Sequence, residues 1–239
     1  MNPRLWIAYD YTDITECLDT LDRILTRHPD RDIIHEIGRP TVLAAALQGF
    51  PIVREFRTRL DGGQQLVADI KGYDVPYSAE ASEYYKAGVD LVTVMATAPD
   101  EAIIEAVNGA RNDSRLVAFD LMSHRNDASK VARAIQLVDM GAKLISCHTG
   151  WNEQAAGKTP HCLIGQLGEA LEGHPDVCMI AMGGLAPESV FELAQLPSFS
   201  RIYAIVGGSS ITRSGDPASV VQAFLDNLRH ANFRQGDPS

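Results

Sequence analysis

Eight times along the chain, an apolar run of strand length is followed by an amphipathic segment of helix length, and this alternation constrains the fold more than any other feature. Strands rich in Val, Ile and Leu with helices between them indicate a parallel sheet that is covered on both faces. The runs expected to form strands are residues 5–10, 32–37, 65–71, 90–95, 115–121, 143–148, 177–182 and 201–206.

The segments between these runs carry helix signals, such as Thr12 or Asp13 as an N-cap before the first one. The expected helices are residues 13–27, 39–50 with a further piece after Pro51, 77–87, 99–109, 128–140, 163–171, 187–196 and 217–230. Eight units in 239 residues favour a closed barrel, and the chain has neither a Gly-x-Gly-x-x-Gly after the first strand nor a Walker sequence. The sequence predicts a single-domain α/β fold, a (β/α)8 TIM barrel over residues 1–232, with a loose C-terminal tail at 233–239.

Charge and composition exclude several kinds of partner. A net charge of -10 and a pI near 5.1 argue against nucleic acid or an anionic membrane surface. There is no visible signal peptide and no apolar run long enough to cross a bilayer, so a cytoplasmic protein is expected. The four cysteines have no paired spacing and are expected to be reduced thiols.

The third apolar run becomes ionic where it ends, at Asp69, Lys71 and Asp74. Residues two apart in a strand point to the same face, so Asp69 and Lys71 are expected to project together. Charges on one face of a buried strand are costly unless they pair or bind something. A structural ion pair is one interpretation; Asp74 at the mouth of the same strand favours a catalytic site.

Polar residues also end other strands of the expected barrel, where the active site of such a fold lies. Asp10, Glu36, Asp120 and His148 end or nearly end the first, second, fifth and sixth runs. Glu36 and Asp69, on neighbouring strands, suit Mg²⁺, which takes oxygen ligands; alternatively, one of them pairs with Lys71. His148 is either a core histidine or an acid/base group.

The last two runs end in glycines, Gly183-Gly184 and Gly207-Gly208-Ser209. Glycine pairs let backbone N–H groups approach an anion, and in a barrel the loops after strands seven and eight are the usual phosphate site. Tight turns after a strand also use glycine pairs, but two pairs on adjacent strands favour phosphate binding.

These motifs resemble the orotidine-monophosphate decarboxylase superfamily. The resemblance spans Asp10 to about Pro217 and rests on Asp69-x-Lys71-x-x-Asp74, Glu36-Ile-Gly and the Gly183-Gly184 turn. Together with the segment 148–154, His-Thr-Gly-Trp-Asn-Glu-Gln, the motif points to the sugar-phosphate branch of 3-hexulose-6-phosphate synthases and 3-keto-L-gulonate-6-phosphate decarboxylases.

The resemblance implies a role for each matching residue. Glu36 and Asp69 would hold Mg²⁺ and the substrate, Lys71 would stabilise an enediolate, and His148 would be the acid/base group. Asp74 would reach the neighbouring subunit's site, so a homodimer is implied. We expect the apolar contact surface of that dimer at Val75, Pro76, Tyr77 and the Tyr84-Tyr85 pair.

Within the branch, Trp151 and the Gly208-Ser209 turn stand where the decarboxylases carry arginines, which makes this chain more similar to a synthase. Asn152 replaces a usual aspartate, and Val75-Pro76 after Asp74 is closer to nucleotide decarboxylases. The expectation is a Mg²⁺-dependent lyase that adds formaldehyde to ribulose 5-phosphate, reversibly. The alternatives are decarboxylation of a 3-keto sugar acid phosphate, a metal-free nucleotide decarboxylase, and a non-catalytic phosphate-binding homologue.

Overall fold

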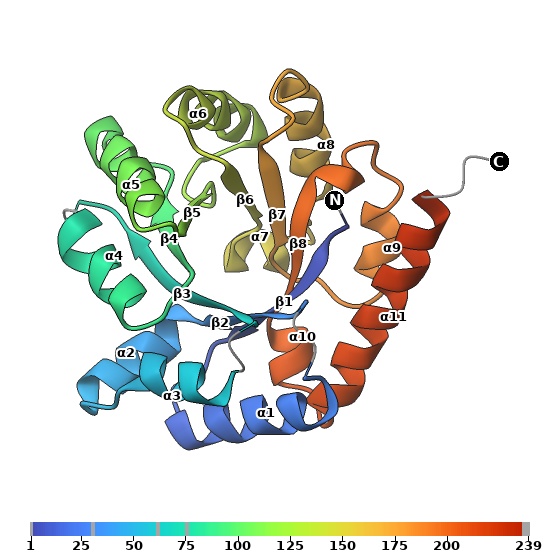
Figure 1. Ribbon diagram of the computed structural model, residues 1–239. Coiled ribbons are helices and arrows are strands. Elements are labelled where there is room, and N and C mark those ends of the chain that lie inside the picture. Colours follow the sequence, from blue (N-terminus) through green and yellow to red (C-terminus); the bar gives the residue numbers. More distant parts are fainter. Residues whose placement is uncertain (1, 30–31, 61–62, 75–76, 236–239) are drawn as a thin grey trace.

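Eight parallel strands close into a barrel in sequence order, and β8 pairs with β1 (Figure 1). The computed structural model describes residues 2–29, 32–60, 63–74 and 77–235. The strands are β1 (Arg4–Tyr9), β2 (Ile34–Ile37), β3 (Gln65–Gly72), β4 (Leu91–Met95), β5 (Leu116–Asp120), β6 (Leu144–His148), β7 (Cys178–Met182) and β8 (Ile202–Gly207). The predicted (β/α)8 barrel is confirmed, and each strand lies within two residues of its expected position.

Helices surround the barrel on its outside, as Figure 1 shows. They are α1 (Ile14–Arg27), α2 (Arg39–Leu47), α3 (Ile52–Arg59), α4 (Tyr77–Lys86), α5 (Asp100–Asn112), α6 (Asp127–Asp139), α7 (Trp151–Ala155), α8 (His161–Ala170), α9 (Ser189–Leu193), α10 (Ser209–Thr212) and α11 (Pro217–Gln235), with a 3₁₀ turn at Phe199–Arg201. Asp13 caps α1 as predicted, because its carboxylate accepts from the N–H groups of Thr15 at 2.8 Å and Glu16 at 3.1 Å.

The sequence-based account of the helices is wrong in two places. The short helices α7 and α10 were not expected; they follow β6 and β8. The tail was expected to begin at residue 233, but α11 runs to Gln235. Buried Leu228 and Ala231 anchor this helix, and no glycine or proline interrupts it before Gly236. Residues 236–239 lie outside the described part of the chain.

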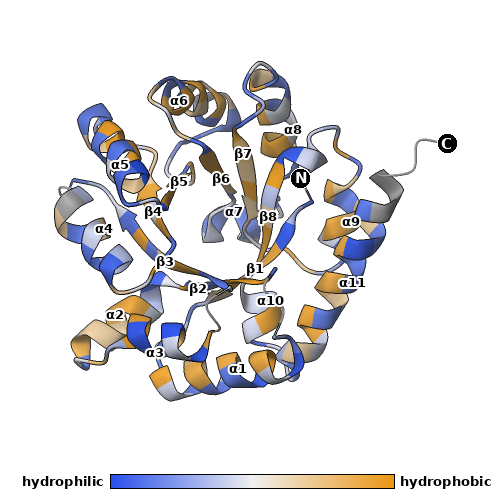
Figure 2. Cartoon of the chain, in the orientation of Figure 1, coloured by the Kyte–Doolittle hydropathy of each residue, from blue (hydrophilic) through white to orange (hydrophobic). Residues whose placement is uncertain are grey.

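Two apolar layers account for the nearly continuous hydrophobicity of the strands. One fills the barrel and includes Trp6, Ile34, Val67 and Ile180. The larger layer lies between the strands and the helices. In Figure 2, β6 and β7 are coloured as hydrophobic along most of their length, whereas α1 and α11 alternate between hydrophobic and hydrophilic stripes. Both faces of each strand are therefore covered, as in other parallel sheets.

Inside the barrel, a polar layer lies immediately beyond the apolar one. On β2 the buried Ile34 is followed two positions later by Glu36, and on β5 Ala118 is followed by Asp120. Because strand side chains alternate, each polar residue points to the same interior as the apolar residue two positions before it. The polar layer thus stands at the carboxyl ends of the strands.

The end of β3 departs from regular pairing. Ala68 pairs with Val92 and Gly72 with Val94, so β3 carries two more residues than β4 over this stretch. Lys71 lies inside this bulge with a φ of 48°, in the left-handed region that non-glycine residues seldom adopt. The bulge changes the direction of the Lys71 side chain relative to an ideal strand.

Two tyrosines of α4 that were expected to form a dimer contact surface are buried within their own chain, so the prediction is wrong for them. Tyr77 and Tyr85 are buried at 6% and 4% exposure, and the Tyr85 hydroxyl donates to the Leu116 carbonyl at 2.7 Å. Helix α4 turns these rings toward the barrel and α5, because its apolar face must be covered within its own chain. Tyr84 is partly buried against the same core, and Val75 and Pro76 lie outside the described residues.

Gly109 in α5 makes room for Tyr77, which gives a test of this packing. A Cβ at Gly109 would lie 2.1 Å from the Tyr77 ring, whereas one at Gly165 in α8 meets nothing within 4 Å. We expect Gly109→Ala to lower the free energy of unfolding by about 1–2 kcal/mol, because the clash outweighs the higher helix propensity of alanine.

Gly165→Ala is the matched control for this substitution, and it should raise the free energy of unfolding by about 0.5–1 kcal/mol. Urea unfolding of both variants checks the pair. A stabilised Gly109→Ala protein would contradict the packing of Tyr77 against α5.

Candidate active site

A cavity of about 910 Å³ opens at the carboxyl ends of the strands. Its floor is polar, and strand ends supply Asp10, Glu36, Asp69, Lys71, Asp120 and His148. Its mouth is formed by α2, α7 and the segment after β8, and it includes the exposed Leu43, Leu47 and Trp151. Most of the residues predicted to form a site from the sequence are therefore in one place.

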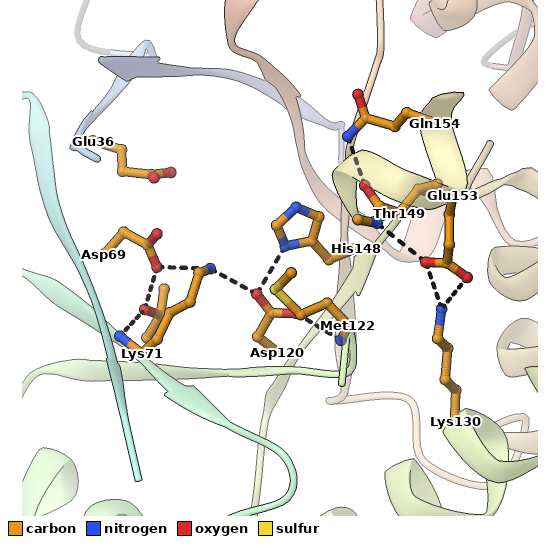
Figure 3. A network of polar contacts seen from close by, with 12 residues as sticks. Glu36, Asp69, Lys71, Asp120, Met122, Lys130, His148, Thr149, Glu153 and Gln154 are labelled. Carbon is orange, nitrogen blue, oxygen red and sulfur yellow. Dashed lines mark hydrogen bonds and ion pairs between the residues drawn. The ribbon is translucent and has the colours of Figure 1, made fainter. Parts of the chain in front are cut away.

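A chain of charged contacts crosses the floor of this cavity (Figure 3). The Lys71 Nζ lies 3.1 Å from Asp69 Oδ1 and 3.0 Å from Asp120 Oδ2. The same Asp120 oxygen lies 2.8 Å from His148 Nδ1. Asp69 and Lys71 do project together, as expected, but the ammonium also reaches Asp120 on a strand two places further around the barrel.

Thr93 on β4 holds the bulged end of β3 in place. Its hydroxyl donates to Asp69 Oδ1 at 2.6 Å and accepts from the Lys71 N–H at 3.0 Å. Thr93 is 3% exposed and lines the cavity. One buried hydroxyl therefore fixes both the carboxylate and the backbone from which the lysine extends, and no motif in the sequence indicated it.

Asp120 joins the lysine to the histidine, a role that sequence reasoning did not assign to it. Its second oxygen accepts from the Met122 N–H at 2.9 Å, so both oxygens are engaged. Its position as the last residue of an apolar strand was the available signal. Its partners, however, lie 49 and 28 residues away in sequence, which only the closed barrel brings together.

The contacts keep Lys71 and Asp120 charged. Burial alone would lower the pKa of Lys71, but the Asp120 and Asp69 carboxylates outweigh it and hold the pKa above its usual value. Burial would raise the pKa of Asp120, but His148 and Lys71 outweigh it and hold that pKa well below the usual range. The floor of the cavity therefore presents a permanent ammonium beside a carboxylate-supported imidazole.

Glu36, Asp10 and Asp69 form a second group, in which carboxylates outnumber cations. Trp6 Nε1 donates to Glu36 at 2.5 Å, and no other side-chain contact of Glu36 within the described chain is a hydrogen bond. Burial, then the charges of Asp69 and Asp10, raise the pKa of Glu36 well above its usual value. Burial, followed by Asp69, also raises the pKa of Asp10.

This donor set fits a hard divalent cation. Such an ion would relieve the repulsion that raises these pKa values, and carboxylate oxygens are its preferred ligands. Among the described residues, no three His, Cys, Asp or Glu side chains stand close enough to form a complete metal site. Glu36 and Asp69 could hold Mg²⁺ with water and substrate completing the shell, which is common for this ion.

The glycines in the turns after β7 and β8 differ in whether they line the cavity. Gly184, Gly208 and Ser209 line the cavity, and their N–H groups donate no hydrogen bond to other described residues. Gly183 also lines it, but it has a φ of 106°, and a Cβ there would lie 2.3 Å from the Thr149 carbonyl. Gly207 is not part of the cavity lining, and a Cβ there would lie 2.4 Å from Ile211, so its expected binding role stays a prediction.

The structure does not bring Asp74 into this cavity. Asp74 is exposed beyond the end of β3, and it is absent from the cavity lining within its own chain. Neighbouring Tyr73 is 52% exposed. The carboxylate thus leaves the rim of its own barrel.

The segment after His148 is held by a buried ion pair. Lys130 on α6 is 3% exposed, and its Nζ lies 3.4 Å from Glu153 on α7. Glu153 also accepts from the Gly150 N–H at 3.1 Å, and Gln154 donates to the Thr149 carbonyl at 2.7 Å (Figure 3). These contacts fix α7, which places Trp151 and Gln154 on the cavity wall.

Comparisons with known proteins agree with this geometry. A 3-hexulose-6-phosphate synthase of Staphylococcus saprophyticus is 30% identical over 225 residues, which cover 94% of this chain and 98% of that protein. The crystal structure of 3-hexulose-6-phosphate synthase from Salmonella typhimurium has a TM-score of 0.78 at 24% identity, covering 95% of this chain and 99% of that one. The structure of 3-keto-L-gulonate-6-phosphate decarboxylase from Vibrio cholerae has a TM-score of 0.76 at 17% identity, covering 96% and 99%.

At 24% and 17% identity, the two solved structures show only that the fold is shared. The family model for orotidine 5′-phosphate decarboxylase / HUMPS matches residues 3–166, which include every charged residue on the cavity floor. The resemblance noted from the sequence is therefore confirmed: the chain belongs to the orotidine 5′-phosphate decarboxylase / HUMPS family.

Proposed function

We propose that this protein is a Mg²⁺-dependent lyase, a 3-hexulose-6-phosphate synthase that adds formaldehyde to ribulose 5-phosphate, reversibly. The contact chain Asp69–Lys71–Asp120–His148 is the observation that carries the proposal. It sets a fixed ammonium beside an acid/base group at the closed end of a cavity. The similarity over 94% of the chain to a protein named as such a synthase supports the choice of substrate.

His148 is the residue that moves the proton in this proposal. Its Nδ1 faces Asp120, and an Nδ1–H donated to that carboxylate leaves the lone pair on Nε2 free to act as a base. Nε2 would take a proton from the carbon next to the ketose carbonyl. The resulting enediolate carbon would then form the new bond to formaldehyde, whose C=O π bond opens to an alkoxide that takes the proton back from Nε2.

Lys71 stabilises the negative charge that this proton loss creates. Its ammonium is already oriented by two carboxylates, so little reorganisation is needed when an enediolate oxygen approaches. Mg²⁺ held by Glu36 and Asp69 would supply Lewis-acid polarisation of the carbonyl and its neighbouring hydroxyl. The free N–H groups of Gly184, Gly208 and Ser209 would bind the phosphate at the opposite side of the cavity.

The second candidate is decarboxylation of a 3-keto-L-gulonate 6-phosphate, which passes through the same kind of enediolate. The same lysine and histidine would serve it, and the fold of the Vibrio cholerae decarboxylase supports it. Trp151, rather than an arginine, on the cavity wall favours the synthase, because a ring offers no charge to a substrate carboxylate.

Incubating the protein with a panel of ketose phosphates, with and without Mg²⁺, tests the function. Formaldehyde consumption with ribulose 5-phosphate is the expected result, and it should disappear in EDTA. Carbon dioxide release from the keto acid phosphate would identify the decarboxylase instead. Full activity in EDTA would contradict the metal-dependent mechanism.

Glu36→Gln should remove most of this activity and yet stabilise the fold. Burial and the neighbouring carboxylates raise the pKa of Glu36, so the folded protein binds a proton there that the unfolded chain loses above about pH 4.3. Wild-type stability therefore falls as the pH rises beyond that value, and glutamine avoids the loss. With both proteins kept free of Mg²⁺ by EDTA, we expect the variant to be more stable by about 1–2 kcal/mol near pH 7, with the difference shrinking toward pH 4.

Glu153→Gln is the matched control for this measurement. Burial opposes it, but the Gly150 N–H and Lys130 lower the pKa of Glu153, so removing this charge should destabilise the protein near pH 7. Denaturant unfolding at several pH values compares the two variants. A Glu36→Gln protein less stable than wild type at pH 7 would overturn the account of the carboxylate group.

We also propose a cytoplasmic homodimer in which Asp74 completes the partner's site. The exposure of Asp74 and Tyr73 outside their own cavity supports a shared site. The four free cysteines agree with a reducing compartment. No helix in the described ranges is long and apolar enough to span a membrane.

Mixing two inactive variants tests the shared site. In a two-fold dimer of Lys71→Ala and Asp74→Ala subunits, one of the two sites regains both residues. A mixture that exchanges subunits should recover about a quarter of the wild-type activity. A Lys71→Ala/Asp74→Ala double variant mixed with either single variant must stay inactive; exchange without recovery in the first mixture would place Asp74 in its own subunit's site.

A further inference from the structure

The cavity has more acidic side chains than Lys and Arg side chains. Asp10, Glu36, Asp69 and Asp120 all line it, and a phosphorylated substrate adds close to two further charges. Three side chains with a permanent positive charge line the same cavity, namely Arg39, Lys71 and Arg213. A phosphate group therefore needs a cation that is not already engaged elsewhere.

Two of these three cations are engaged. Lys71 lies between two carboxylates, and Arg39 donates to the Ile70 carbonyl. The backbone N–H of Arg213 donates to the Ser209 carbonyl at 3.1 Å, but its side chain is exposed and makes no hydrogen bond or ion pair to any residue in the described part of the chain. Its guanidinium is thus available to a ligand.

One aromatic contact holds Arg213 in position. The guanidinium carbon lies 5.7 Å from the centre of the Trp151 ring. Trp151 begins α7 after β6, and Arg213 ends α10 after β8. Because β7 lies between these strands in the barrel, the contact spans the loop that carries Gly183 and Gly184.

The sequence position of Arg213 places it beside the proposed phosphate site. It follows Ser209 by four residues, in the same segment after β8. The proton-transfer group His148 instead belongs to the charged chain on the floor. Among the residues described, the cation of the cavity lining whose side chain has no hydrogen-bond or ion-pair partner is therefore in the same segment as Gly208 and Ser209, which also line the cavity.

We propose that Arg213, positioned by the Trp151 ring, binds the phosphate of the sugar-phosphate substrate and sets the enzyme's requirement for a phosphorylated ligand. The proposal rests on the proposed function for the nature of the substrate. A ring contact engages the flat face of a guanidinium, so the N–H donors in its plane stay free for two phosphate oxygens. Trp151 is then a positioning residue, and Arg213 a binding residue.

Calorimetric titration with inorganic phosphate, and separately with ribulose 5-phosphate, tests Arg213 without relying on turnover. Arg213→Ala should weaken both affinities by about 10- to 100-fold, since a charge-assisted hydrogen-bonded contact is lost. Arg213→Lys should fall between, because lysine keeps the charge without the planar donors. Arg125→Ala is the matched control: this arginine is exposed in the loop after β5, outside the cavity lining, and its loss should change neither affinity.

Trp151 is tested through its coupling to Arg213. Trp151→Phe keeps an aromatic face and should bind phosphate nearly as wild type does, whereas Trp151→Ala should weaken binding about two- to fivefold. In the Arg213→Ala background, Trp151→Ala should have no further effect, because the group it positions is gone. In the formaldehyde assay, Trp151→Ala should raise the KM for ribulose 5-phosphate and leave kcat nearly unchanged.

The outcomes separate this proposal from the proposed function. Unchanged phosphate affinity in Arg213→Ala, or no phosphate binding by the wild type, overturns the role of Arg213. Equal and additive losses from the two alanine variants overturn the positioning role of Trp151. Phosphate binding that depends on Arg213 in a protein with no formaldehyde-dependent activity would support the phosphate site and reject the synthase.

Discussion

The ammonium group of Lys71 stands in the mouth of the barrel with 19% of its side chain exposed, and the carboxylates of Asp69 and Asp120 offset the cost of withdrawing it from water. The rest of the site is arranged around this pairing. The bulge at the end of β3 sets the direction of the lysine side chain, and the Thr93 hydroxyl bonds to the backbone of that bulge. Asp120, which contacts the lysine, also bonds to His148 and fixes its position. Removing either carboxylate would leave a buried charge with half its partners, so chemistry and structure are coupled at this point.

The group of Glu36, Asp10 and Asp69 differs because its carboxylates outnumber the cations beside them. Glu36 and Asp10 are held where burial and the charges of neighbouring carboxylates raise their pKa values, and Trp6 is the one residue of the described chain whose side chain donates a hydrogen bond to Glu36. Such an arrangement lowers the stability of the free protein, and a bound ligand offsets this loss, as in other functional sites. The barrel can carry this cost because the apolar layer beneath, from Trp6 to Val206, is separate from the polar layer.

Local pattern made the strands and the two charges of β3 predictable. Each strand is a short apolar run, and a spacing of two predicts that Asp69 and Lys71 project together, although in the structure a bulge sets the direction of the Lys71 side chain. Asp120 was visible as a strand-final aspartate, but its pairing with Lys71 depends on a closed barrel and not on nearby residues. Tyr77 and Tyr85 show the converse error: aromatic residues on the helix after Asp74 suggested a dimer contact, whereas the glycine at position 109 allows α5 to cover the ring of Tyr77.

The floor of the cavity does not by itself choose between aldol addition and decarboxylation, because both reactions need a stabilised enediolate and a proton carrier. The substrates of aldol addition and decarboxylation differ in the group attached to the reacting carbon, and residues on the walls of the cavity must recognise that group. In this chain the wall after β6 presents the indole of Trp151 at 64% exposure, held from behind by the Lys130–Glu153 pair. An indole cannot neutralise a substrate carboxylate, and the Arg213 guanidinium carbon lies 5.7 Å from the centre of its ring. A charged floor at the strand ends combined with variable loops is how one barrel supports several reactions, and in this chain the loops after β6 and β8 supply Trp151 and Arg213 to the walls.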